Sequence, residues 1–313
     1  MKYLIKFTLF LIFTLIFSFT TQAQNAADWV RVQSDNGEFS IETPANPVYF
    51  YDKDGFYFNN SFSGAYNFRE MQMLNATLDK TYMSVEIYRM TNPKGYLDEI
   101  DGRNGLAFSK IKPDLKDFTV RKGVFDRSYE RVKKLTENIN FEVRYIASKT
   151  HFYVVTVWNK GKSNAVSERI FSSINLGAAQ NNSETSSIVK ISKLKPVTIE
   201  QIGGQLSKKE IESLPENPKY ENGKPGELFV LHVPQSGWNF TNVNSRAKGV
   251  VRLKVTYSKE GRIAKILLVS GLPGGLNRLA FFSILRTKFL PPEKDGEPVT
   301  IERVITYDYT DQF

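Results

Sequence analysis

The clearest pattern in this chain lies near its C-terminal end, where apolar and polar residues alternate over 251–257. A period of two predicts a strand with one buried face. A turn at 258–261 and a second strand over 263–270 follow, and residues 276–287 have helical character. A last strand is predicted over 299–309, so this part of the chain predicts a small unit of antiparallel strands covered by one helix.

The sequence before this unit also predicts both strands and helices. Asp54-Gly55 lies between the aromatic runs 49–51 and 56–58, which predicts a hairpin turn. Apolar residues without a period of two predict helices over 95–111 and 165–174. Alternating residues predict strands over 39–41, 82–88, 118–125, 139–147 and 152–158.

Periodicity is lost between these two regions. Residues 178–187 are rich in Asn, Ser and Ala, and residues 190–226 are polar and contain four prolines. Such composition favours loops and linkers. We therefore predict an α+β protein with a first domain at 28–177, a linker with little regular structure at 178–227, and a second domain at 228–313.

The first residues have the order of a secretory signal peptide. Two lysines open the chain, residues 7–19 are apolar and uncharged, and small polar residues follow. The apolar run is shorter than the ~20 residues of a membrane-spanning helix. The pattern predicts a leader at 1–24, cleaved after Ala23 or Gln24, and a periplasmic mature protein without a transmembrane span. An uncleaved anchor is the alternative.

Composition narrows the classes of partner. The chain has no cysteine, so an exported form has no disulfides and depends on packing for its stability. Its formal net charge is +9, which falls to +7 without the two lysines of the leader. Such a charge favours anionic partners. Export argues against nucleic acid and leaves acidic lipid headgroups or anionic sugars as weaker candidates.

The residue sets of common catalytic and metal sites are missing from the sequence. Its two histidines, His151 and His232, have no second ligand at a metal-binding spacing. The glycine-rich run 271–275 lacks the lysine and hydroxyl residue that complete a phosphate loop. The sequence therefore predicts a non-enzymatic protein without a cofactor or a metal.

Residues 228–309 resemble the C-terminal domain of TonB-family proteins. The resemblance implies a small domain that contacts other proteins of the cell envelope, and an outer-membrane receptor is one candidate. Four features carry it in the correct order and spacing: a long strand at 249–255, the turn Glu260-Gly261-Arg262-Ile263, a strand-to-helix junction at 269–276, and the run 288–292 followed by Asp295-Gly296-Glu297-Pro298-Val299.

Three features depart from the full energy transducers of that family. No long spacer rich in proline and lysine links the leader to the body, and the leader has a cleavage pattern. Trp238-Asn239 stands where the family has a Pro-x-Tyr-Pro sequence. These departures leave a part in energy transduction open.

A looser resemblance covers residues 28–177. Trp29, the run 39–44 and the closing segment 169–174 are similar to PsbP-like domains. The resemblance implies an α/β/α sandwich around an antiparallel sheet. It also implies a binding or assembly role in place of catalysis.

Two surfaces are candidate contact sites. Phe282 and Leu285 lie where related helices usually carry polar residues, and such a patch marks a contact with the linker, the first domain or another subunit. The last strand is the candidate site for strand addition, in which a partner's extended segment extends a sheet. The candidate partner-binding residues are Trp238, Ile301, Val304, Ile305 and Tyr307.

These observations predict an exported protein-interaction protein. The alternative is a periplasmic protein that binds a small ligand among the aromatic residues of 49–62. Cross-strand packing is the simpler role for those aromatic side chains. The sequence leaves the identity of the partner and the oligomeric state open.

Overall fold

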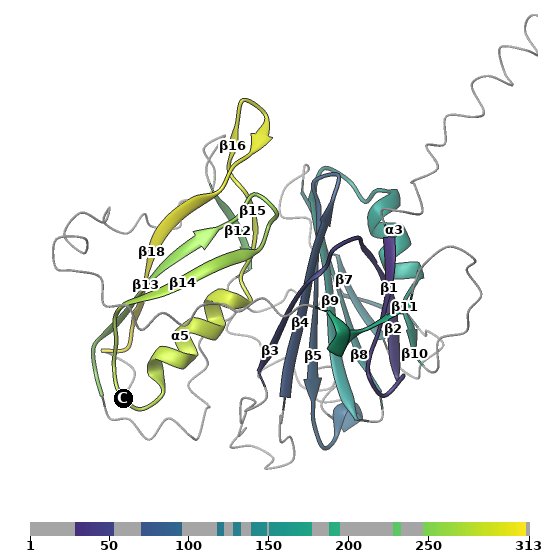
Figure 1. The fold of residues 1–313 in the computed structure, drawn as a ribbon, viewed down its shortest axis with the longest axis horizontal. Coiled ribbons are helices and arrows are strands. Elements are labelled where there is room, and N and C mark those ends of the chain that lie inside the picture. Colours follow the sequence, from purple (N-terminus) through teal and green to yellow (C-terminus); the bar gives the residue numbers. More distant parts are fainter. Residues whose placement is uncertain are drawn as a thin grey trace, which may run out of the picture.

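Strands predominate and helices are few in the computed structural model of this chain, which is of the α+β type. The predicted leader, the predicted turn at Asp54-Gly55 and most of the predicted helix at 95–111 lie outside the described residues. The structure describes residues 29–52, 70–95, 118–121, 128–132, 139–148, 150–176, 188–194, 228–232 and 247–310 (Figure 1).

A seven-stranded antiparallel sheet forms the centre of the N-terminal part, in the order β3-β4-β5-β9-β8-β7-β6. In the interior strand β5, Val85 and Ile87 face one core, whereas Tyr82 and Tyr88 face the other. Such a strand, buried on both faces, is rich in β-branched and aromatic residues. The strands are β3 (Val48–Asp52), β4 (Glu70–Leu78), β5 (Thr81–Arg89), β6 (Phe118–Arg121), β7 (Ser128–Val132), β8 (Ile139–Ala147) and β9 (His151–Lys160).

A four-stranded sheet and one helix cover the first of these faces. The sheet has the order β10-β2-β1-β11, with β11 parallel to β1. A capping box begins helix α3, because Asn164 and Ser167 bond to each other's backbone N–H groups. The elements are β1 (Trp29–Gln33), β2 (Phe39–Pro44), α3 (Ala165–Ser172), β10 (Asn175–Leu176) and β11 (Ile188–Lys190).

This layer differs from the sequence-based expectations in two ways. Within the described ranges it consists of a sheet with α3, and not of helices alone as in an α/β/α sandwich. In addition, β11 and the 3-10 turn η3 (Ile191–Lys193) lie inside 178–227, where composition predicts little regular structure. The reason is tertiary: β11 pairs with the edge of β1, and the Ile191 side chain is fully buried in the core of the first part.

The C-terminal part contains a three-stranded antiparallel sheet in the order β14-β13-β18, and helix α5 lies against β13 and β14. Alternation along β13 places Leu253 and Val255 in the core and leaves Arg252 exposed. The elements are β12 (Phe229–His232), β13 (Val250–Tyr257), β14 (Ile263–Ser270), α5 (Leu276–Leu285), β15 (Lys288–Leu290), β16 (Glu293–Lys294), β17 (Glu297–Pro298) and β18 (Ile301–Asp308).

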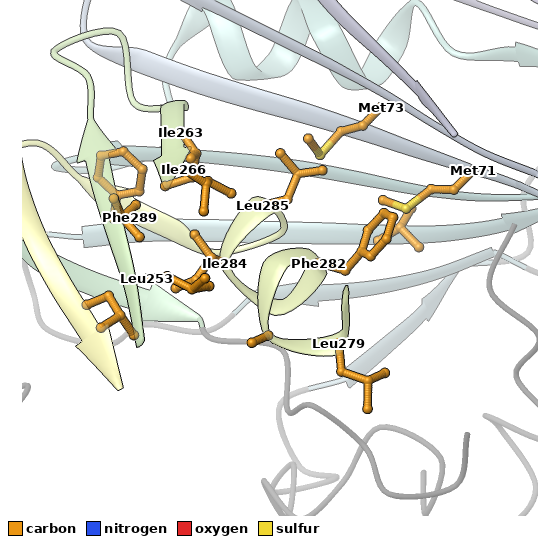
Figure 2. Packing of buried hydrophobic residues seen from close by; sticks show 14 of the residues in the cluster. Met71, Met73, Leu253, Ile263, Ile266, Leu279, Phe282, Ile284, Leu285 and Phe289 are labelled. Atoms are coloured by element: carbon orange, nitrogen blue, oxygen red, sulfur yellow. The ribbon is translucent and has the colours of Figure 1, made fainter. Parts of the chain in front are cut away.

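One hydrophobic cluster runs through both parts of the chain. Met71 and Met73 of β4 lie beside Phe282 and Leu285 of α5 (Figure 2). The C-terminal part therefore covers the second face of the seven-stranded sheet (Figure 1). No helix in the described ranges has the length and apolar character needed to cross a membrane.

Candidate functional site

Strand β18 has one edge without a strand neighbour among the described residues. Among the described residues it pairs only with β13, in an unbroken antiparallel register of eight residue pairs. The Tyr309 amide donates to the Gly249 carbonyl at 2.8 Å, and backbone groups alternate in direction along such a pair. Odd-numbered residues therefore bond to β13, and the N–H and C=O groups that point away from it belong to Glu302, Val304, Thr306 and Asp308.

The opposite edge of the same sheet is less regular. The register between β13 and β14 shifts at two places. Bulges increase the local twist and interrupt the row of backbone groups that an incoming strand would use. β18 therefore offers the better template for an extended segment.

The side chains of β18 fall on two faces. Ile301, Ile305 and Tyr307 lie on the side of α5 and contact the core shared by the two parts. Because α5 lies mainly over β13 and β14, Ile301 and Tyr307 remain only half-buried. Val304 lies on the opposite face, where it pairs with Lys254 of β13. The structure thus gathers three of the candidate partner-binding residues on one face, and Trp238 lies outside the described residues.

The face of the sheet opposite α5 carries an ion pair at the edge. Lys254 Nζ lies 2.8 Å from Glu302 Oε2, and the Thr256 hydroxyl donates to Glu302 Oε1 at 3.2 Å. The hydrogen bond from Lys254 lowers the pKa of the Glu302 carboxyl, although partial burial opposes it. Glu302 therefore stays ionised, and its carboxylate is already held by its own sheet.

Helix α5 is apolar on two sides because it lies between two layers. Ile284 points toward Leu253 of the three-stranded sheet, whereas Phe282 points toward the seven-stranded sheet (Figure 2). The rings of Phe282 and Phe50 are 6.3 Å apart at an interplanar angle of 73°. Both Phe282 and Leu285 are buried. Three alternative contacts were predicted for these two residues. The structure shows the contact with the first part of the chain.

A buried charge network lies in the same interface. Glu86 of β5 is 3% exposed, and its carboxylate contacts Arg286 Nε at 2.8 Å and Lys288 Nζ at 3.0 Å. The Tyr88 hydroxyl donates to the same carboxylate, and Lys288 also donates to Ser84 Oγ at 2.8 Å. Burial raises the pKa of Glu86, but the two cations outweigh it and hold the pKa at about 2.

Backbone groups also join the two parts. Trp158 of β9 donates from Nε1 to the Phe289 carbonyl of β15 at 2.7 Å. At the rim, Lys80 donates to the Gly296 carbonyl at 2.8 Å, and Lys160 contacts Glu293 at 2.8 Å. The interface therefore combines an apolar centre with directed polar contacts, which fix the orientation of the C-terminal part.

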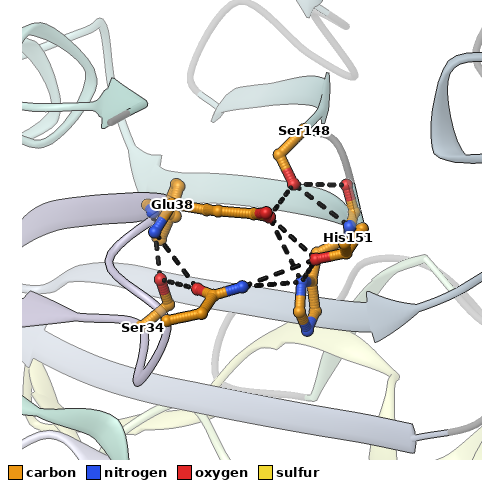
Figure 3. A network of polar contacts seen from close by, with 7 residues as sticks. Ser34, Glu38, Ser148 and His151 are labelled. Carbon is orange, nitrogen blue, oxygen red and sulfur yellow. Dashed lines mark hydrogen bonds and ion pairs between the residues drawn. The ribbon is translucent and has the colours of Figure 1, made fainter. Parts of the chain in front are cut away.

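A second polar cluster ties two turns together at one end of the first part (Figure 3). Glu38 Oε2 accepts from the hydroxyls of Ser148 at 2.6 Å and Thr150 at 2.9 Å, and it lies 3.5 Å from His151 Nδ1. Burial opposes these contacts, but together they lower the pKa of Glu38. The Ser148 hydroxyl bonds to the carboxylate, whereas the Thr150 hydroxyl also lies 2.7 Å from His151 Nδ1.

Metal chemistry has no evident centre in the part of the chain that the structure describes, where no three metal-ligating side chains gather. Comparison of the sequence with protein-family models finds no match, and comparison with curated proteins finds none either.

Sequence reasoning missed the charged residues of the interface. Glu86 lies in a strand whose alternation predicts a solvent-facing polar side. One signal could have found it, because a lone carboxylate in an otherwise apolar and aromatic run requires a cation once both faces are covered.

Proposed function

We propose that this protein is an exported protein-interaction protein whose C-terminal part captures an extended segment of a partner by strand addition to β18. The observation that carries the proposal is the unbroken register of β18 with β13, which leaves the outward backbone groups of Glu302, Val304 and Thr306 without a second strand among the described residues. Main-chain hydrogen bonds then supply affinity, and the alternating side chains supply specificity.

The half-buried residues of β18 support the same proposal. Ile301 and Tyr307 expose part of their apolar surface on the side of α5. An added strand would place its own side chains beside them and remove this surface from water. The docking of α5 on the first part supports it further, because the interface uses the helix and leaves β18 on the far side of the sheet (Figure 1).

The resemblance to TonB-family C-terminal domains supports this mechanism and implies a partner in the cell envelope, with an outer-membrane receptor as one candidate. The first part would serve as a PsbP-like assembly module that holds the C-terminal part. Export belongs to the same proposal and has its own test. N-terminal sequencing of the mature protein is expected to begin at Gln24 or Asn25, and an intact leader in the membrane fraction would contradict it.

The test of strand addition uses a proline at an outward position. Val304→Pro removes an N–H that points away from β13, so it blocks an added strand without removing a hydrogen bond of the sheet. The probe is a nine-residue peptide of alternating valine and threonine with a central glutamine. Binding is expected to slow amide hydrogen exchange at Val304 and Thr306 in the wild-type protein, and the proline variant is expected not to bind.

Val304→Ala is the matched control, because it loses the same packing but keeps the N–H. It is expected to bind the peptide with an affinity close to that of the wild type. Equal binding by the proline variant, or no change in exchange at Val304 and Thr306, would show that β18 is not the pairing edge.

A further inference from the structure

A charged side chain binds one of the outward backbone groups of β18. Arg303 donates from a terminal guanidinium nitrogen to the Glu302 carbonyl at 2.9 Å. Glu302 is one of the even-numbered residues whose carbonyl points away from β13. The contact therefore occupies an acceptor that an added strand needs for its own N–H.

Such a contact protects an edge strand. Exposed edges pair with other chains, and charged side chains at the edge oppose this pairing. A segment that adds to β18 must move the guanidinium away from the Glu302 carbonyl. The displaced guanidinium then needs a new acceptor, because a cation near apolar surface without a partner is costly.

Among the described residues, the sheet neighbours of Arg303 on its own face offer no such acceptor. Its neighbours along β18 on that face are Ile301 and Ile305, and its cross-strand neighbour on β13 is Val255. The nearest carboxylate along the strand is that of Glu302, which projects to the other face and is held by Lys254. An acceptor for the displaced guanidinium must therefore come from the incoming segment.

We infer that Arg303 makes β18 selective for extended segments that carry an aspartate or glutamate opposite it, between two apolar residues on the same face. This inference rests on the proposed strand addition. In an added antiparallel strand, Arg303 faces its opposite residue at a non-hydrogen-bonded position, where the side chains come closest. Arginine and a carboxylate there form a two-pronged, charge-assisted contact, and apolar residues two positions away on either side cover Ile301 and Ile305.

The test compares three nine-residue peptides of alternating valine and threonine whose central residue is glutamate, glutamine or lysine. The pattern reads the same from both ends, so the direction of pairing does not affect the comparison. Wild-type protein is expected to bind the glutamate peptide at least about fivefold more tightly than the glutamine peptide, the effect of one net hydrogen bond. The lysine peptide is expected to bind most weakly.

The matched variants are Arg303→Ala and Arg303→Glu. The alanine variant is expected to bind all three peptides within about twofold of one another and the neutral peptide more tightly than the wild type, since the Glu302 carbonyl is free. The glutamate variant is expected to prefer the lysine peptide. Circular dichroism and thermal melts establish that both variants are folded before binding is compared.

The outcomes separate this inference from the proposed function. Equal binding of the three peptides by the wild type, together with loss of binding in Val304→Pro, keeps strand addition and overturns the role of Arg303. Absence of any protection at Val304 and Thr306 with all three peptides overturns strand addition itself. Dimerisation of Arg303→Ala in sedimentation without peptide would make a second copy the occupant of the edge, and would also overturn the inference.

Discussion

Gly261 lies directly against the ring of Tyr82, so that a Cβ added at Gly261 would come within 2.1 Å of the Tyr82 Cδ1 atom. The glycine belongs to the turn between β13 and β14, and Tyr82 belongs to β5 of the first part. The backbone of Gly261 also has a φ of +71°, which residues other than glycine adopt at a cost in free energy. The turn therefore uses glycine for its own shape and for the contact between the two parts.

Gly261→Ala is expected to destabilise the protein more than Gly296→Ala. Gly296 has a φ of +81° but nothing within 4 Å of its added Cβ, so its substitution costs only the backbone strain of roughly 1–2 kcal/mol. Overpacking against Tyr82 adds about 1–3 kcal/mol at Gly261. Denaturant unfolding of the full chain measures both values, and equal losses would show that Tyr82 yields without cost.

Glu86→Gln is expected to lower the free energy of unfolding by about 3–5 kcal/mol, because it leaves Arg286 and Lys288 buried without a carboxylate. Glu297→Gln is the matched control, since that carboxylate is 79% exposed and lies 3.6 Å from Lys80. A surface pair contributes only about 0–1 kcal/mol. A small effect at Glu86 in denaturant unfolding would mean that water reaches the network.

Glu86 is also expected to make the protein sensitive to acid. Its pKa of about 2 in the folded state lies below the ordinary value of 4.5. The stability from this group is therefore fully present above pH 4.5 and is lost as the pH falls toward 2. The contribution is about 3 kcal/mol. Denaturant unfolding across this range is expected to show that much less pH dependence in Glu86→Gln, and parallel curves would contradict it.

Phe282→Ala is expected to cost about 3–5 kcal/mol of stability, because its ring fills the contact with Phe50 and Met71. Phe281 of the same helix is only half-buried, and Phe281→Ala is expected to cost roughly half as much. Thermal melts of the two variants make the comparison. Equal losses would mean that the side of α5 that carries Phe282 is no more tightly packed than the side that carries Phe281.

Strands with one buried face were predictable from sequence because their residues alternate. Residues 251–257 cover all of β13 except its first residue, and 263–270 coincide with β14. β4 was missed because Met71 and Met73 face one core while the next residue, Leu74, faces the other, so the apolar residues of this strand do not keep a period of two. β11 was missed because its pairing partner lies far away in the sequence.

The candidate site was predictable to the level of the strand. The pattern of 299–309 indicates a last strand, and β18 covers most of that range. The direction of its backbone groups depends on the register with β13, which alternation alone does not determine. The contact of Arg303 with the Glu302 carbonyl depends in turn on that direction. Long-range packing, and not local pattern, therefore decides the chemistry of the edge.

The parallel pairing of β1 with β11 has a consequence for the order of folding. It joins Arg31 to Ile188, so the small sheet cannot close until nearly the whole first part of the chain is present. Contacts between such distant segments form late, because the intervening loop must lose its freedom first. During synthesis β1 therefore has no β11 to pair with until that strand has been made. The core between the two sheets of the first part is complete only after residue 191 has emerged.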